Sequence, residues 1–301
     1  MADEVVVSVP ARVGLLGNPG DGYGGRTIAF TVAELAAEVT AAPAEDWDVG
    51  VGDGSILLQA AVRQMNLPVA ARLAFTTTIP RQMGLAGSSA IIIAAMRAIA
   101  VVNDHSMDPV ELAKAALEAE TRFLQVTAGP QDRVIQAYGG MLDMDFAEPW
   151  DAASYRRLDP GLLPEGIFVA WKGGVGESSG TLHSDVRRRW DANDGEVRAH
   201  INRFRHHAER GLAAMQSDDA GELADVFDAS FASRSALWSL SQHDRDMVAL
   251  AKRHGAGAKF CGSGGAIVGV LRDAAGLADL QQAFTDAGYG FLVPTVGPPH
   301  A

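Results

Sequence analysis

The sequence predicts a mixed fold of strands and helices arranged in two domains. Its 301 residues, 48% apolar and 21% charged, can bury one large core or two ordinary ones. Strand-like and helix-like patterns lie on both sides of residues 150–164, where Pro149, Asp159-Pro160-Gly161 and Pro164 give the chain a loop-like character. We therefore expect the domain boundary there and divide the chain into residues 1–155 and 156–301.

Three apolar, β-branched runs near the N-terminus predict strands at residues 5–7, 13–16 and 27–32, with Pro10 and Gly17 bounding the first two. Between the last two, residues 17–25 read GNPGDGYGG, a loop so rich in glycine that its amides should be exposed. A hairpin turn is the structural alternative, although a two-residue turn needs far fewer glycines. Glycine accounts for 33 of the 301 residues, about 11% against a usual share of about 7%. This excess is a first indication of a ligand, because glycine allows the backbone to approach another group closely.

The apolar run at residues 90–102 predicts a buried helix, because it is longer than most strands. The preceding loop, residues 84–89 with the sequence GLAGSS, would place free amide N–H groups at the positive end of the helix dipole, which suits a phosphate. It is not a Walker loop, since no Lys-Ser or Lys-Thr pair follows, and it is not a dinucleotide fingerprint after a strand. Simple helix capping by Ser88 or Ser89 is the alternative.

Residues 109–125 predict a second helix that ends before Gly129-Pro130. Its apolar line consists of Leu112, Ala116, Ala119 and Phe123. Lys114, Glu118 and Arg122 are spaced by four residues on the opposite, solvated face. Glu120 stands four residues after Ala116 and four before Leu124, so we expect it to flank the buried stripe, with a solvated position as the alternative.

The C-terminal half continues with the same two kinds of pattern. Apolar runs predict strands at residues 167–171, 266–271 and 291–296. Amphipathic spacing predicts helices at residues 197–215, 223–240 and 275–287.

Charge and cysteine content exclude several classes of protein. With 25 Lys and Arg against 37 Asp and Glu, the net charge of −12 argues against a nucleic-acid binder. The single cysteine, Cys261, can form neither an internal disulfide nor a cysteine-based zinc site, which suits a reducing compartment. The N-terminus shows no signal-peptide pattern, and the longest apolar run is too short to span a bilayer. We expect a cytoplasmic protein with no membrane anchor, and no partner protein is indicated.

Three segments carry a resemblance to a known family. Residues 12–25, 80–90 (PRQMGLAGSSA) and 259–266 (KFCGSGGA) resemble, in order, the three motifs of the GHMP small-molecule kinases, which include galactokinase, homoserine kinase and mevalonate kinase. The resemblance covers nearly the whole chain. It implies a two-domain α+β fold, with a ribosomal S5 domain 2-like, ATP-binding N-terminal half and a ferredoxin-like C-terminal half. It also implies ATP with Mg²⁺, and phosphoryl transfer to a small alcohol or sugar.

Within this superfamily, four further segments most resemble glucuronokinases, which phosphorylate glucuronate at its anomeric oxygen. They are residues 11–19, 129–134, 138–140 and 183–190. The expected partner is therefore a small sugar acid such as glucuronate. Another sugar, a heptose or arabinose, is the alternative within the same chemistry. A catalytically silent nucleotide-binding regulator is the alternative from another class.

Phosphoryl transfer requires positioning, cancellation of phosphate charge, and a carboxylate that takes or orients the hydroxyl proton. Asp132, on the turn after Gly129-Pro130, is the catalytic candidate, and the resemblance places Arg12 beside it; an ion pair with Arg133 or a helix cap is the alternative for Asp132. The resemblance assigns Mg²⁺ to the Ser89 hydroxyl and the Glu120 carboxylate. It assigns the phosphates of ATP to Pro80, Gly84, Leu85, Ala86, Gly87, Ser88, Ser89 and Ala90.

The acceptor pocket is expected between the N-terminal loop and the third motif. Asn18, Asp21 and Tyr23 occupy the loop in which related kinases hold sugar hydroxyls, although the Glu-His-Thr-Asp-Tyr stretch of galactokinase is absent, which argues against galactose. Gly262, Ser263 and Gly264 form the third motif, for which a tight turn is the alternative. A substrate carboxylate favours an arginine, and Arg187 is the candidate from the 187–189 cluster; an exposed basic helix face is the alternative there.

Overall fold

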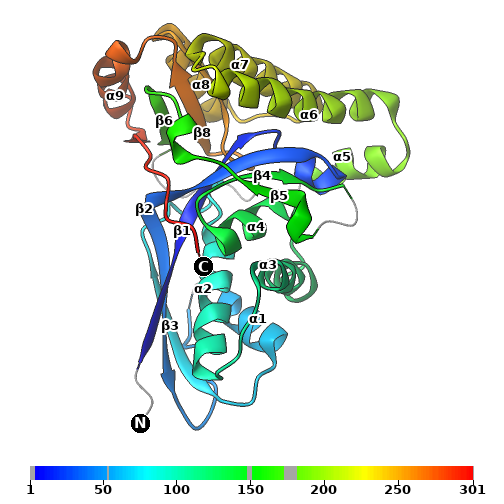
Figure 1. The fold of residues 1–301 in the computed structure, drawn as a ribbon, viewed down its shortest axis with the longest axis vertical. Coiled ribbons are helices and arrows are strands. Elements are labelled where there is room, and N and C mark those ends of the chain that lie inside the picture. The colour runs from blue at the N-terminus through cyan, green and yellow to red at the C-terminus, as the bar shows by residue number, and fades with distance from the viewer. Residues whose placement is uncertain (1–3, 53, 148–150, 173–181, 301) are drawn as a thin grey trace.

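The computed structural model describes residues 4–52, 54–147, 151–172 and 182–300, and these residues build two antiparallel sheets with helices packed on them (Figure 1). The first sheet has the order β1-β2-β4-β5, with β3 also paired to β2. The second has the order β7-β8-β6-β9. The first sheet and helices α1 to α4 form the lower part of the view, and the second sheet with α6 to α9 forms the upper part. The expected mixture of helices and sheets is confirmed.

The first sheet is built on two long strands, β1 (Val5–Leu16) and β2 (Arg26–Pro43), which pair along most of their length. β3 (Ala71–Thr77), β4 (Met141–Asp145) and β5 (Tyr155–Arg157) complete it. The prediction of two separate strands on either side of Pro10 is wrong. A register shift between Pro10 and Ala11 accommodates the proline, so β1 continues through it as one strand.

The helices of the N-terminal half are α1 (Ser55–Met65), α2 (Gly87–Val102), α3 (Pro109–Glu118) and α4 (Gln131–Tyr138). The buried helix predicted at residues 90–102 is confirmed: α2 packs on β1 and β2, and residues 89–96 are all buried. The predicted helix at residues 109–125 changes character midway. α3, which starts with a capping box at Asp108 and Glu111, ends at Glu118, and a π-helical turn follows at Ala119–Phe123.

The C-terminal half contains β6 (Ile167–Trp171), α5 (Leu182–Asp191), α6 (Gly195–Gln216), α7 (Ala220–Leu237) and α8 (Gln242–Arg253). It ends with β7 (Ala256–Phe260), β8 (Ala266–Leu271), α9 (Leu277–Asp286) and β9 (Gly290–Leu292). The predicted elements are present, but the last strand is shorter than expected. Pro294 cannot donate to a sheet, and the chain then leaves β6 so that Val296 bridges Val32 of the first sheet.

The two halves are joined by several contacts. Arg205 of α6 pairs with Asp145 of β4 at 3.0 Å, and Gly211 of the same helix packs directly against Leu16 of β1. Buried residues of both sheets belong to one continuous apolar cluster, and the C-terminal segment returns to the first half, where Pro299 bridges Gly139. The division at 155/156 stays a prediction. Its loop-like region begins at Pro149 and Trp150, which lie outside the described residues.

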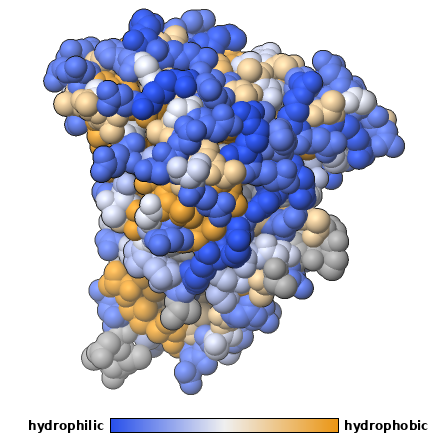
Figure 2. All heavy atoms as spheres, turned by 45° about the horizontal axis from the view of Figure 1, so that its top comes forward, coloured by the Kyte–Doolittle hydropathy of each residue, from blue (hydrophilic) through white to orange (hydrophobic). Residues whose placement is uncertain are grey.

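Hydrophilic residues cover much of the face shown in Figure 2, with apolar residues gathered in its left half. Among the residues that the structure describes, no helix has the length and apolar character needed to cross a membrane.

Candidate active site

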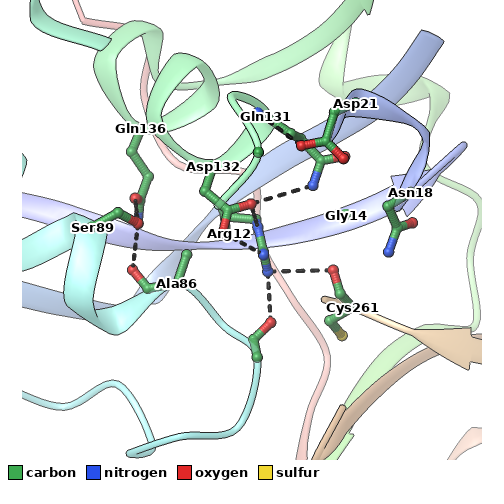
Figure 3. Close-up of polar contacts among 12 residues, drawn as sticks. Arg12, Gly14, Asn18, Asp21, Ala86, Ser89, Gln131, Asp132, Gln136 and Cys261 are labelled. Atoms are coloured by element: carbon green, nitrogen blue, oxygen red, sulfur yellow. Dashed lines mark hydrogen bonds and ion pairs between the residues drawn. The ribbon is translucent and has the colours of Figure 1, made fainter. Parts of the chain in front are cut away.

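The three sequence motifs meet at the side chain of Arg12, on β1 (Figure 3). Its Nε and Nη2 donate to the two carboxylate oxygens of Asp132 at 2.6 and 2.7 Å. Its Nη1 donates to the carbonyl oxygen of Gly84 at 2.6 Å and to that of Cys261 at 3.3 Å. The guanidinium is buried, so one cation fixes the loop at residues 84–89, which we call the phosphate loop after the ligand proposed for it, the β7–β8 turn and the carboxylate relative to one another.

Asp132 lies in the first turn of α4, and its carboxylate is oriented by Arg12. The N-cap residue of this helix is Pro130, which has no side-chain capping bond, and Arg133 Nη1 lies 3.7 Å from Asp132 Oδ2. Asp132 is therefore not a helix cap, and its ion pair with Arg133, at 3.7 Å, is longer than its contacts with Arg12. Gln131 adds a weaker bond to Oδ1 at 3.4 Å. The carboxylate side chain keeps 20% of its surface exposed, so a ligand can reach it.

The phosphate loop presents backbone amides without a capping side chain. The N-cap residue of α2 is Ala86, held at a φ of +62°, and α2 begins at Gly87. The first three amides of a helix have no partner within it, and here no side chain accepts from them. Ser89 is turned inward, where its hydroxyl contacts Ala86 O at 3.2 Å and Gln136 Oε1 at 2.6 Å, while Ser88 is exposed. Serine capping is thus not the reason for this sequence, and the free amides suit an anion.

The third motif forms the turn between β7 and β8 and packs backbone to backbone against the phosphate loop. A Cβ on Gly84, whose φ is +63°, would lie 2.7 Å from the carbonyl oxygen of Gly264 and 3.1 Å from the amide nitrogen of Ser263. A Cβ on Gly262 would collide with the carbonyl oxygen of Gly84. This turn is tight, which is the alternative given above for the third motif. Its glycines are also needed because the loop at residues 84–89 packs so closely against it.

Asp21 of the N-terminal loop lies near the Asp132 carboxylate, and Tyr23 follows it in the same loop. Asp21 Oδ2 accepts from the backbone N–H of Gln131 at 3.2 Å. Burial, reinforced by the negative charge of Asp132, raises the pKa of Asp21 above its ordinary value. Burial also raises the pKa of Tyr23 to about 12, so its hydroxyl stays protonated and can donate. Both side chains can therefore bind the hydroxyl groups of an acceptor.

Asn18 occupies the same loop, but its amide is already committed to the protein. Its Oδ1 accepts from Lys259 Nζ at 2.6 Å, and its Nδ2 donates to Phe260 O at 3.3 Å. The side chain is 4% exposed. The expectation that Asn18 binds substrate directly is therefore corrected: it ties the loop to β7, because both ends of its amide have buried partners.

Arg187 reaches the edge of this loop. Its Nη1 donates to Gly22 O at 2.9 Å and its guanidinium lies 5.8 Å from the centre of the Tyr23 ring, but its Nε pairs with Asp191 at 3.1 Å. About half of the side chain is exposed. The neighbouring Arg188 and Arg189 pair with carboxylates of their own, as an exposed basic helix face would. A substrate carboxylate would compete with Asp191 for Arg187.

Glu120 is buried, as its position beside the apolar stripe predicted, whereas Glu118 is exposed and pairs with Arg122 at 3.3 Å. The Glu120 carboxylate forms an ion pair with Arg133, whose side chain is also buried. Ser89 and Glu120 have the hard oxygen donors that Mg²⁺ prefers, but each is engaged elsewhere, and no contact among the described residues joins them. In this structure Arg133 compensates the Glu120 charge, so a Mg²⁺ ion would have to compete with that arginine for the carboxylate.

Several site residues were missed from the sequence. Gln136 donates through Nε2 to the carbonyl oxygens of Pro10 and Ala86, at 3.0 and 3.1 Å. Lys259 donates to Gly14 O and Leu15 O at 2.7 and 3.1 Å, and burial lowers its pKa to about 7. Lys259 stands inside the third motif, and that position was the available signal. Gln136 lies between the segments 129–134 and 138–140, so no motif pointed to it.

Comparisons with known proteins identify one family of enzymes. A family model described as the GHMP kinases N terminal domain matches residues 55–140. Glucuronokinase 1 of Arabidopsis thaliana is 32% identical in an alignment that includes 86% of this chain and 82% of that protein. The chain belongs to the GHMP kinase family. Probable glucuronokinase 2 of the same plant is 31% identical with the same coverage, and the family resemblance inferred from the three motifs is confirmed.

Solved structures place this GHMP kinase in the same fold. Galactokinase of Lactococcus lactis, solved with galactose, has a TM-score of 0.83 at 14% identity, and the match covers 98% of this chain and 94% of that one. A mevalonate kinase has a TM-score of 0.74 at 15% identity, with 97% and 99% covered. The expected two-domain α+β GHMP kinase fold is confirmed. As a member of this family, the chain is an ATP-dependent kinase.

Proposed function

We propose that this GHMP kinase transfers the γ-phosphoryl group of ATP to the anomeric hydroxyl of glucuronate or a related sugar acid. The coarser assignment, a sugar kinase, is supported by the two plant glucuronokinases and by the sugar kinases among the structural neighbours. The finer assignment is supported by the identity to those plant proteins over most of both chains. The expected cytoplasmic location remains a prediction.

The observation that carries the proposal is the bidentate pair of Arg12 and Asp132 beside free helix amides. The amides of the first turn of α2 would hold phosphate oxygens, since they and the helix dipole favour negative charge. An acceptor hydroxyl between Asp132 and the phosphate would pass its proton to Asp132 or be oriented by it. The acceptor oxygen then bonds to phosphorus, the bond from phosphorus to the leaving oxygen of ADP breaks, and Arg12 holds the carboxylate in line.

Asp21 and Tyr23 are proposed to bind hydroxyl groups of the sugar, and Gly262, Ser263 and Gly264 to line the pocket beside them. A silent regulator would need the phosphate loop but not an oriented carboxylate. The pair at Asp132 therefore favours a working enzyme over a nucleotide sensor.

Magnesium is the expected companion of ATP in this family, and Ser89 and Glu120 remain proposed ligands. Binding through Glu120 would require its carboxylate to leave or share Arg133, so no catalytic step is assigned to the metal here.

A coupled assay of ADP release tests the substrate assignment. Glucuronate, galacturonate, glucose, galactose, arabinose and a heptose are compared at equal concentration with the purified full-length chain. The proposal predicts the highest kcat/KM for glucuronate. Full activity on galactose or a heptose, with none on glucuronate, would replace the sugar acid by that neutral sugar.

A further inference from the structure

A second arginine lies beside the site: Arg234, on α7. It is 5% exposed, and its Nη2 donates to the carbonyl oxygen of Ser263 at 3.3 Å. Its Nε is buried and makes no hydrogen bond. Within the described part of the chain, no carboxylate lies within ion-pair distance of it. An unpaired buried charge is costly, so a residue of this kind calls for an explanation.

The other arginines around the site already have carboxylate partners. Arg12 pairs with Asp132, Arg133 with Glu120 and Arg187 with Asp191. Asp244, the carboxylate with the largest electrostatic effect on Arg234, accepts instead from Gly265 N at 2.9 Å and from Ser241 Oγ at 2.8 Å. Among the described residues, Arg234 therefore lacks the direct ion pair that each of these neighbouring arginines has.

The position of Arg234 is on the acceptor side of the site. The carbonyl that it binds belongs to Ser263, beside the glycine that contacts the Arg12 guanidinium. Its charge acts on Tyr23 and Asp21, the two residues of the N-terminal loop proposed to bind sugar hydroxyls. The rings of Trp238 and Phe260 lie 5.2 and 5.0 Å from its guanidinium carbon, so aromatic side chains hold the cation in place.

We propose that Arg234 binds the carboxylate of the sugar-acid acceptor and selects it over neutral sugars. This inference rests on the proposed function and deepens it. A carboxylate would supply the missing counter-charge and accept hydrogen bonds from the guanidinium. A neutral hydroxymethyl group in the same place would leave the cation unpaired, so the site would discriminate against it. The sequence-based candidate, Arg187, keeps an auxiliary place at the rim.

The test compares KM for glucuronate, glucose and ATP in the wild type and four variants of the full chain. Arg234→Met removes the charge, and Arg234→Gln removes it while keeping a donor toward Ser263 O. Arg187→Met tests the rim candidate. Arg188→Met is the control, because its side chain is 80% exposed and pairs with Asp185 on the same helix. Circular dichroism and thermal melting establish that each variant is folded, and Arg234→Gln replaces Arg234→Met if the latter does not fold.

Either Arg234 variant should raise KM for glucuronate by roughly 30-fold or more, the loss typical of truncating one partner of a buried charge pair. KM for glucose and for ATP should change by less than about threefold. Arg188→Met should match the wild type. An unchanged KM for glucuronate in the Arg234 variants would overturn the inference. Equal increases in KM for glucose and glucuronate would also overturn it, because they would indicate a purely structural role for Arg234. A large effect confined to Arg187→Met would assign the carboxylate to the rim instead.

The two proposals fail in different ways. If the wild type phosphorylates no sugar acid, the proposed acceptor is wrong, and the role of Arg234 falls with it. If the wild type phosphorylates glucuronate and the Arg234 variants do so equally well, only the role of Arg234 falls.

Discussion

Replacing Arg12 by methionine removes the cation that joins the three motifs. The side chain of Arg12 is 5% exposed and that of Asp132 is 20% exposed, so little water can replace the lost partner. The change deletes two charge-assisted bonds to Asp132 and leaves the carbonyl oxygens of Gly84 and Cys261 without this donor. Removing one member of such a pair costs about 3–5 kcal/mol, and the exposed part of Asp132 places our expectation at about 3 kcal/mol.

Urea unfolding of Arg12→Met, Asp132→Asn and the double variant measures this coupling. Asp132→Asn should cost less than Arg12→Met, because the guanidinium keeps its two carbonyl acceptors. The double variant should cost less than the sum of the single ones by about 1–3 kcal/mol. Arg188→Met, a surface control, should stay within about 0.5 kcal/mol of the wild type. Additive losses, or a loss below about 1 kcal/mol for Arg12→Met, would show that the pair does not hold the site together.

Two further predictions concern buried ionisable side chains. Glu120→Gln should lower the free energy of unfolding by about 3 kcal/mol, because Arg133 loses its buried partner, whereas Glu118→Gln, at an exposed position, should change it by less than about 0.5 kcal/mol. If Glu120 also binds Mg²⁺, Glu120→Gln should raise the Mg²⁺ concentration needed for half-maximal activity and Glu118→Gln should not. Equal effects of the two variants would contradict the assignment of Glu120. Burial lowers the pKa of His207 from 6.5 to about 4, so the unfolded chain takes up the proton first as the pH falls. The resulting stability is present above pH 6.5 and is lost progressively as the pH falls from about 6.5 to 4. In urea titrations at several pH values, His207→Gln should reduce this loss of stability below pH 6.5. His206→Gln, at an exposed position, should leave the loss unchanged. The same loss in both variants would refute His207 as its cause.

Local sequence patterns predicted those elements whose apolar residues form a long, regular run. α2 and its glycine-serine loop followed from one apolar run, and the burial of Glu120 followed from its spacing to Ala116. The unbroken β1 was not predicted, because a register shift at Pro10 depends on the partner strand. Glu120 lies in a π-helical turn, whose altered spacing also depends on tertiary packing.

Contacts distant in sequence could not come from periodicity. Arg12 and Asp132 are 120 residues apart, and only the family resemblance placed them together. Arg234 was missed, although a signal was present. It follows Phe231 by three residues and precedes Trp238 by four, so an arginine stands within the apolar stripe of α7. Charged residues are rarely fully buried unless something pairs with them.

The central claim is that the Asp132 carboxylate, held by Arg12, acts on the acceptor hydroxyl during phosphoryl transfer. The most direct measurement is ADP release with saturating glucuronate and ATP, paired with a titration of ATP affinity, in Asp132→Asn. The account predicts that kcat falls by about 10²–10⁴-fold while ATP affinity stays within a few-fold of the wild type. A folded Asp132→Asn protein with unchanged kcat would contradict it.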